Sequence, residues 1–174
     1  MNEKNTFWES AGKAGLVLGG VSILYLMITA LIDTVSADGL SIFLKLFSTV
    51  LWIAKIVGCI LLMRIFMVRF AQANPEADRP RVFRFGMATA LLSALLYSAA
   101  FLAYVTFIAP GLFEEVLFRM ADYNPMIDDS VIDSVLPALP AFTFFFNLAY
   151  CFVFGTVVAA IHAGNIRPDN PFAE

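Results

Sequence analysis

The sequence predicts an all-α integral membrane protein with four transmembrane helices and a short amphipathic helix on the outer face. Hydrophobic residues make up 60% of the 174 residues and charged residues 14%, against roughly a quarter charged in a typical soluble domain. The apolar stretches 14–32, 41–68, 85–109 and 141–161 come close to or exceed the ~20 residues that a helix needs to cross a bilayer. Because backbone in lipid must satisfy its own hydrogen bonds, runs this long predict helices and exclude barrel strands. Residues 1–174 are expected to form a single four-helix membrane domain.

The first stretch, 14–32, is expected to stay in the protein as a helix. The chain continues with Asp33 where a signal peptide would have a small-residue cleavage site, and the apolar core before it is too long for such a peptide. Small residues recur along one stripe of this span and permit close approach of two helix backbones. Gly15 and Gly19 are therefore predicted to pack against a neighbouring helix, within the chain or between two copies.

The second stretch, 41–68, places Lys55 where the middle of a bilayer should lie. Lys55 is ten residues from Lys45 and nine from Arg64, which at ~1.5 Å per residue is roughly 13–15 Å along the helix. Its side chain reaches only about 6 Å, so its amine cannot easily extend to the water interface. None of the four spans contains Asp or Glu to neutralise it. An ionisable group at this depth is by default a functional-site hypothesis.

Polar residues at a comparable depth supply the predicted surroundings of Lys55. Asn147 and Tyr150 lie in the fourth span, Tyr97 in the third and Tyr25 in the first. A pocket of these groups would suit an amine, or an anion such as a lipid phosphate or a carboxylate brought by a partner protein. Three interpretations of Lys55 stay open: a polar residue that fixes helix register, a ligand, lipid or partner contact, and ion or proton conduction. Asn147 also suits hydrogen bonding between helices.

The connection between the second and third spans is basic and hydrophilic. Its segment 74–81 combines two prolines with charged residues and predicts a turn. Basic residues concentrate in this connection, before the first span and after the fourth span. They are Lys4, Lys13, Arg64, Arg69, Arg79, Arg81, Arg84 and Arg167. The connections 33–40 and 110–136, in contrast, are acidic. The positive-inside rule then places both termini in the cytoplasm, with Lys45 as the one contrary residue.

The third stretch, 85–109, has small residues along one face. Gly86, at the start of this face, is predicted to pack against another helix. Pro110-Gly111 should end this helix. In the segment 111–124, apolar residues at helical spacing alternate with charged ones, which predicts an amphipathic helix lying on the outer leaflet. Glu115 and Arg119, four residues apart, are expected to form a surface ion pair.

One catalytic motif has to be weighed against the rest of the chain. Glu114-Glu115-Val116-Leu117-Phe118-Arg119 resembles the Glu-Glu-x-x-x-Arg signature of the intramembrane prenyl-endopeptidase-like family, which also needs histidine motifs on later helices. The single histidine, His162, lies at the far end of the fourth span, at the start of the predicted cytoplasmic tail 162–174. A membrane-embedded hydrolase is therefore disfavoured, and no catalytic residue, metal site or cofactor is expected.

Two stretches carry a resemblance to a known family. Asn5-Thr6-Phe7-Trp8-Glu9-Ser10 runs into Gly15-Leu16-Val17-Leu18-Gly19-Gly20, and the basic loop leads to Phe83-Arg84-Phe85-Gly86. With the outer segment and the last span, this pattern resembles the bacterial membrane family called domain of unknown function 4199. The resemblance implies four spans in a bacterial inner membrane and assigns no activity.

The function expected from the sequence is that of a non-enzymatic inner-membrane protein: a subunit, scaffold or lipid-interacting partner of a larger membrane assembly. The expected partners are membrane lipids, another membrane protein or a second copy of the chain. A net charge of −3 gives no reason to expect nucleic acid. The alternative is a small transporter or channel that uses an intramembrane recess around Lys55.

Overall fold

The computed structural model describes residues 3–35, 41–123 and 129–166, which form helices and no strand. Four of these helices are long and apolar enough to span a membrane, which confirms the four predicted spans at that level. The elements in chain order are α1 (Glu3–Val35), α2 (Ser41–Ala73), α3 (Arg79–Ala103), the π-helical turn η2 (Tyr104–Ile108), α4 (Leu112–Tyr123), α5 (Asp129–Val135), the 3-10 turn η3 (Leu136–Ala138) and α6 (Leu139–Ile166).

Several sequence expectations concern parts of the chain that the structure does not describe. The connection at 36–40 and the tail at 167–174 lie outside the described residues, as do the side chains of Asp33 and Lys45. Three described elements, η2, α5 and η3, were not predicted as separate elements, and η2 lies within the predicted span 85–109.

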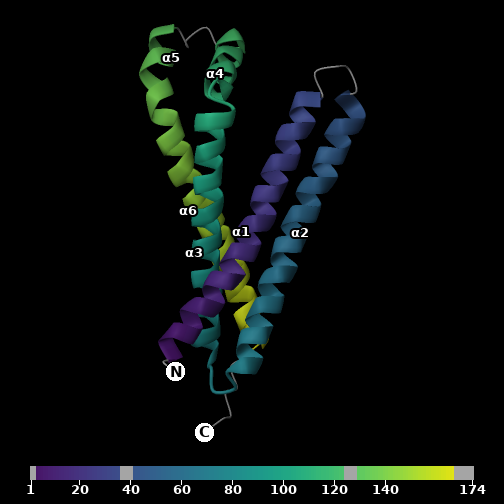
Figure 1. Cartoon of the computed structure of the whole chain (residues 1–174), viewed down its shortest axis with the longest axis vertical. Helices are drawn as coiled ribbons and strands as arrows, with labels where there is room; N and C mark the ends of the chain where they lie inside the picture. Colours follow the sequence, from purple (N-terminus) through teal and green to yellow (C-terminus); the bar gives the residue numbers. More distant parts are fainter. Residues whose placement is uncertain (1–2, 36–40, 124–128, 167–174) are drawn as a thin grey trace.

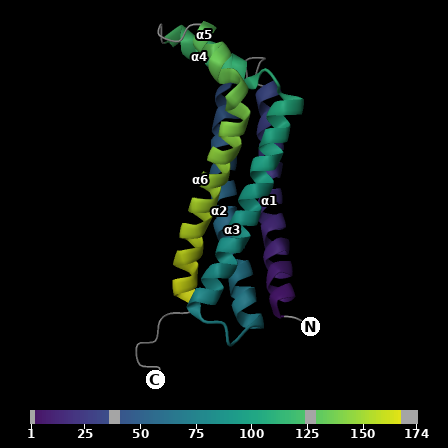
Figure 2. The ribbon, with the colours of Figure 1, turned by 90° about the vertical axis from the view of Figure 1, so that its left-hand side faces the viewer.

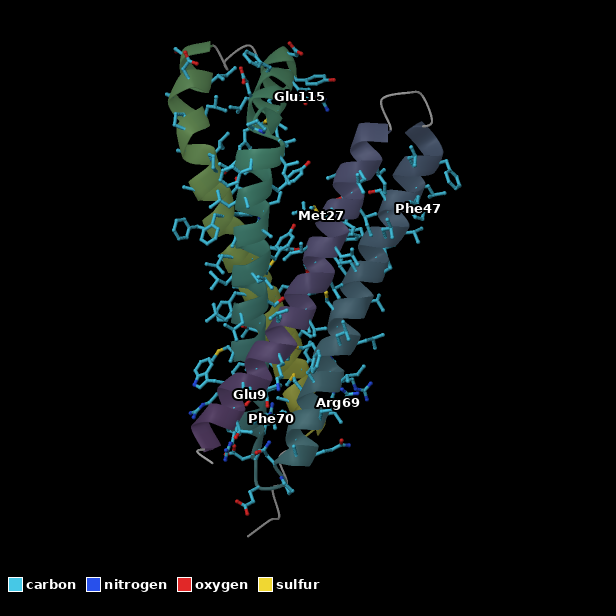
Figure 3. The ribbon with its side chains drawn as sticks, in the orientation of Figure 1. Glu9, Met27, Phe47, Arg69, Phe70 and Glu115 are labelled. Carbon is cyan, nitrogen blue, oxygen red and sulfur yellow. The ribbon has the colours of Figure 1, made fainter. Side chains whose placement is uncertain are left out.

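The four long helices lie lengthwise beside one another (Figures 1 and 2). The start of α1, the α2–α3 connection and the end of α6 share one end, which we call the basic end after Arg69, Arg79, Arg81 and Arg84. At the opposite end lie α4 and α5, and we call it the acidic end after Glu114, Glu115, Asp122 and Asp133. Figure 3 marks Arg69 and Glu115 near these two ends. The pair α1–α2 diverges from the pair α3–α6 towards the acidic end (Figure 1).

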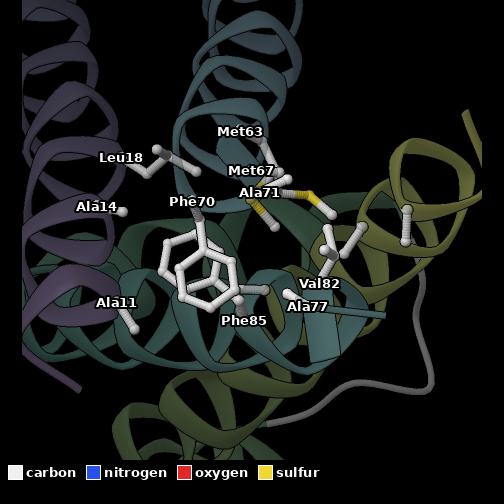
Figure 4. Packing of buried hydrophobic residues seen from close by; sticks show 13 residues of the cluster. Ala11, Ala14, Leu18, Met63, Met67, Phe70, Ala71, Ala77, Val82 and Phe85 are labelled. Carbon is white, nitrogen blue, oxygen red and sulfur yellow. The ribbon is translucent and has the colours of Figure 1, made fainter. Parts of the chain in front are cut away.

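The buried apolar core sits near the basic end (Figure 4). Phe70 of α2 stacks on Phe85 of α3 with ring centroids 4.2 Å apart. Phe7 of α1 meets Phe85 edge-on at 5.9 Å, so three helices share one aromatic cluster. Met67 of α2, fully buried, also belongs to this core. The helices converge here because alanines and glycines from α1, α3 and α6 allow close packing.

Glycines mark the closest helix contacts. A Cβ atom added at Gly15 would lie 2.7 Å from the Cβ of Leu92, and one added at Gly19 would lie 2.7 Å from the Cδ2 of Leu96, so both glycines lie directly against α3. Gly86 of α3 likewise lies against α6, where an added Cβ would be 2.6 Å from the Cβ of Ala159. All three contacts are within one chain, which fits the small-residue packing expected from their spacing.

The turn before α3 explains where that helix begins. The carboxylate of Asp78 accepts a hydrogen bond from the backbone N–H of Arg81 at 2.9 Å and so caps the helix. Pro80 occupies the first turn, where its missing N–H costs no helical hydrogen bond. Asp78 and Pro80 therefore fix the start of α3 at the basic end.

Replacement of this cap should weaken the fold measurably. Asp78→Ala is expected to lower the free energy of unfolding by about 1 kcal/mol, because a helix N–H loses its acceptor. Glu76→Ala is the matched control, since Glu76 is an exposed acid in the same turn and caps no helix. Reversible unfolding in mixed micelles measures both, and equal values for the two variants would contradict the capping role.

The third span ends at Ile108, just before the Pro110-Gly111 pair that was expected to end it, but its last turns are not α-helical. Its α-helical part stops at Ala103, and η2 continues it with wider turns, in which the N–H of Ala109 donates to the carbonyl of Tyr104 at 2.9 Å. The turn at Pro110 and Gly111 then leads into α4, close to the predicted 111–124 segment. The predicted ion pair is confirmed, with Arg119 and Glu115 2.7 Å apart.

Candidate functional site

Lys55 lies in a cleft of about 150 Å³ that is walled by α1, α2, α3 and α6. We call it the Lys55 cleft. Its polar lining comes from all four helices and consists of Ser22, Lys55, Cys59, Ser93, Tyr97, Tyr150 and Cys151. The rest of the lining is apolar, apart from the indole N–H of Trp52. The site is therefore an apolar recess with one cationic side chain.

Two aromatic rings hold the amine of Lys55. Its Nζ lies 4.9 Å from the ring centroid of Tyr25 on α1 and 4.8 Å from that of Tyr97 on α3. Both distances fall within the ~6 Å range of cation–π attraction. The sequence had suggested tyrosines as hydrogen-bond partners, and the structure instead places the amine over their ring faces. The lysine thus joins α2 to both α1 and α3.

The predicted site residues do not all meet. Tyr97 and Tyr150 line the Lys55 cleft together with Lys55, whereas Asn147 is not part of its lining. Asn147 precedes Tyr150 on α6 by about one turn, towards the acidic end. Residues three apart on a helix lie on the same face, so the spacing of Asn147 and Tyr150 in the sequence could not show that only Tyr150 lines the cleft.

Four polar lining residues were not assigned to the site from the sequence. Cys59 was on the predicted face of Lys55, four residues along the same helix, and this spacing was an available signal. Ser22 was on the glycine stripe of the first span, which was interpreted as a packing seam. Ser93 lies four residues before Tyr97 on α3, so the same spacing was an available signal for it. Cys151 could be found only from the register of α6 against α2, which no sequence pattern specifies.

The cation of the cleft has no matching acid among the described side chains around it. Within the described ranges, no Asp or Glu lines the cleft. Across the same described residues, no group of three or more His, Cys, Asp or Glu side chains is placed to hold a metal ion. The electrostatic character of the cleft is therefore set by the amine of Lys55.

The cleft has a buried floor and an exposed rim. Leu18 and Ala94 on its floor are 7% and 2% exposed. Trp52 of α2 is 51% exposed, and Tyr150 and Phe154 of α6 are 62% and 41% exposed. We conclude that the cleft opens sideways between α2 and α6, onto the apolar outer surface of the bundle. Such an opening admits a molecule with a polar end and an apolar body.

The residues of the hydrolase-like motif lie elsewhere. Glu115 on α4 is at the acidic end and is paired with Arg119 (Figure 3). His162 lies in the last turns of α6, towards the basic end (Figure 1). The structure thus places the acidic pair and the histidine at opposite ends of the bundle.

No family model, no curated protein and no solved structure matches this chain.

Proposed function

We propose that this chain is a non-enzymatic inner-membrane protein that interacts with lipid through the Lys55 cleft, as a subunit or scaffold of a larger assembly. Four helices of sufficient length and apolarity support membrane insertion. The start of α1, the end of α6 and the arginines of the α2–α3 region share the basic end, which supports cytoplasmic termini.

The observation that carries this proposal is a cation in a sideways-opening cleft whose lining, among the described residues, includes no acid. A lysine at the centre of a membrane helix costs about 2.5–3.5 kcal/mol even on the lower of the available scales. Each cation–π contact stabilises the charged lysine by about 0.5–2 kcal/mol. The two tyrosine rings therefore offset much of this cost without forming an ion pair. An anionic group would add the charge-assisted hydrogen bonds that the rings cannot supply.

The first test compares what stays bound to the wild type and to Lys55→Met. After purification in mild detergent, native mass spectrometry of the wild type is expected to show a bound lipid-type molecule, and Lys55→Met should retain at most about one tenth as much. Methionine keeps most of the side-chain length and removes the charge. Lys13→Met is the control, because Lys13 is exposed, pairs with Glu9 at 2.7 Å and does not line the cleft.

Equal retention of lipid by wild type and Lys55→Met would contradict the proposed function, provided that both proteins show the same helical circular dichroism. If a second membrane protein stays bound to the wild type but not to Lys55→Met, the ligand of the cleft is a protein partner instead of a lipid. Loss of lipid from Lys13→Met as well would point to a general loss of fold instead of a site.

The second candidate function is that of a small transporter or channel using the same recess. The observation that favours it is the divergence of the pair α1–α2 from the pair α3–α6 towards the acidic end (Figure 1). Transport would require the two pairs to move relative to each other around the Lys55 cleft. Solute or ion flux into proteoliposomes separates this function from lipid binding without transport.

We also propose membership in the domain of unknown function 4199 family. The support comes from where the resembling residues lie in the fold. Phe7 and Phe85, from the two resembling stretches, contact each other in the core at the basic end. Gly15 and Gly86, from the same two stretches, form close helix contacts. The shared pattern thus coincides with the residues that bring the four helices together.

A further inference from the structure

We infer that the ligand of the Lys55 cleft is a single-chain amphipathic acid, with one carboxylate at Lys55 and one hydrocarbon chain leaving between α2 and α6. This inference rests on the proposed function and specifies the chemical class of the lipid. Three properties of the cleft support it: its size, the depth of Lys55 and the hydrogen-bonding groups of its lining.

The size of the cleft favours one chain. Its volume of about 150 Å³ equals that of an engineered protein cavity that holds a benzene molecule. A carboxylate and the first few carbons of a chain are of this size. A phosphodiester together with the glycerol that joins two chains is larger than this. The remaining chain carbons would leave past Trp52 and Phe154, whose exposed rings continue the apolar surface outside the cleft.

The depth of Lys55 favours a carboxylic acid over a phosphodiester. The candidate membrane span in α2 runs from Leu46 to Ala73, and Lys55 is roughly 13 Å along the helix from its Leu46 end at ~1.5 Å per residue. A charged group pays a large desolvation cost at such depth, and a group that can become neutral does so. A carboxyl group can enter in its protonated, neutral form and release that proton to bulk water as it pairs with the charged Lys55, whereas a phosphodiester stays ionised throughout. The acid therefore reaches the cleft at the lower cost.

The polar lining also matches a carboxylate. A carboxylate has two oxygens that accept about four hydrogen bonds. The Lys55 amine offers three N–H donors, and Ser22 and Ser93 add two hydroxyl groups to the same lining. No described residue of the lining carries a negative charge that would repel the ligand. The cleft thus combines a charge, several donors and an apolar exit.

The test measures binding of hexadecanoic acid and hexadecanol, which share one chain length and differ in the head group. Purified, delipidated protein in non-ionic detergent is titrated with each probe, and native mass spectrometry gives the dissociation constants. The wild type is expected to bind the acid at least tenfold more tightly than the alcohol. Lys55→Met should remove this preference, and Lys55→Arg, which keeps a positive charge, should restore part of it.

A second variant tests the cleft without touching its charge. Cys151→Phe would fill the space beside Lys55, because Cys151 lines the cleft on α6. Acid binding is expected to fall at least tenfold. Val153→Phe is the matched control, since Val153 lies on the same helix, is 59% exposed and does not line the cleft. It should bind the acid as the wild type does.

Three outcomes would overturn the inference, and they differ in what they leave standing. Equal affinity of the wild type for acid and alcohol would show that Lys55 does not select a carboxylate. Lys55-dependent retention of a two-chain phospholipid, with no competition by the acid, would reject the single chain but keep the proposed function. Failure of the wild type to bind either probe or any phospholipid would reject both.

Discussion

Phe85→Ala is expected to lower the free energy of unfolding by about 3 kcal/mol, the lower end of the range for removing a buried phenylalanine ring, because packing and not transfer from water is lost in an apolar environment. Phe85 is 2% exposed and stacks on Phe70 with ring centroids 4.2 Å apart. It also meets Phe7 edge-on at 5.9 Å. The substitution would therefore remove a contact that α3 makes with both α1 and α2. Reversible unfolding in mixed micelles of detergent and sodium dodecyl sulfate measures the loss.

The control for this prediction is the same substitution on the outer surface. Phe107 in η2 is 82% exposed, so Phe107→Ala leaves no internal cavity and should change the free energy of unfolding by less than about 0.5 kcal/mol. Because lipid and detergent tails are themselves apolar, the loss at Phe85 reports lost packing rather than transfer from water. Similar losses for both variants would show that the aromatic cluster does not stabilise the bundle.

Gly15→Leu is expected to separate α1 from α3 and to lower the free energy of unfolding by about 1–3 kcal/mol or more. An added Cβ would lie 2.7 Å from the Cβ of Leu92, 3.3 Å from the carbonyl oxygen of Thr89 and 3.4 Å from the backbone nitrogen of Ser93. Two of these three atoms belong to the backbone of α3, so rotation of a side chain cannot relieve the clash. The helix α1 must move, and it carries Tyr25 away from Lys55.

Gly12→Leu is the matched control, one turn earlier on the same helix. An added Cβ at Gly12 has no heavy atom within 4 Å, other than the local helix backbone. Leucine favours the helix more than glycine does, so this variant should keep or slightly raise the stability. Thermal unfolding and retention of bound lipid are measured for both variants. A Gly15→Leu protein as stable as Gly12→Leu would show that the α1–α3 contact is looser than the structure indicates.

Much of the fold could be predicted because a membrane imposes a length on each apolar helix. The four apolar stretches correspond to α1, α2, α3 and α6, and the amphipathic segment corresponds to α4. The helices extend beyond the apolar stretches because polar residues at their ends continue the same hydrogen-bonding pattern; α1, for example, spans Glu3–Val35. The helix α5 was missed because seven residues are too few for an apolar period to stand out. The turn η2 lies inside the predicted third span, and an apolar sequence does not distinguish π-helical from α-helical turns.

From the sequence, the candidate site could be predicted only as Lys55 and the polar residues at a similar depth. Lys55 was identified because a lysine in an apolar stretch departs from the pattern of its own helix. Tyr97 and Tyr150 were identified by their depth along the spans. The same criterion included Asn147, which does not line the cleft. Depth specifies position along a helix but not rotation about its axis, and rotation decides which side chains face one another.

The sequence by itself determined the number of long helices, the difference in charge between the two ends of the bundle and the presence of a cation halfway along the second span. Each of these follows from the order of residues along the chain. The tertiary structure decided the cleft. Whether Lys55 meets Tyr25 and Tyr97 depends on how three helices are rotated and spaced. That spacing is set at the basic end by contacts such as Gly15 against α3 and Phe70 against Phe85. Packing between helices depends on the shapes of surfaces far apart in the chain, which local sequence patterns do not encode.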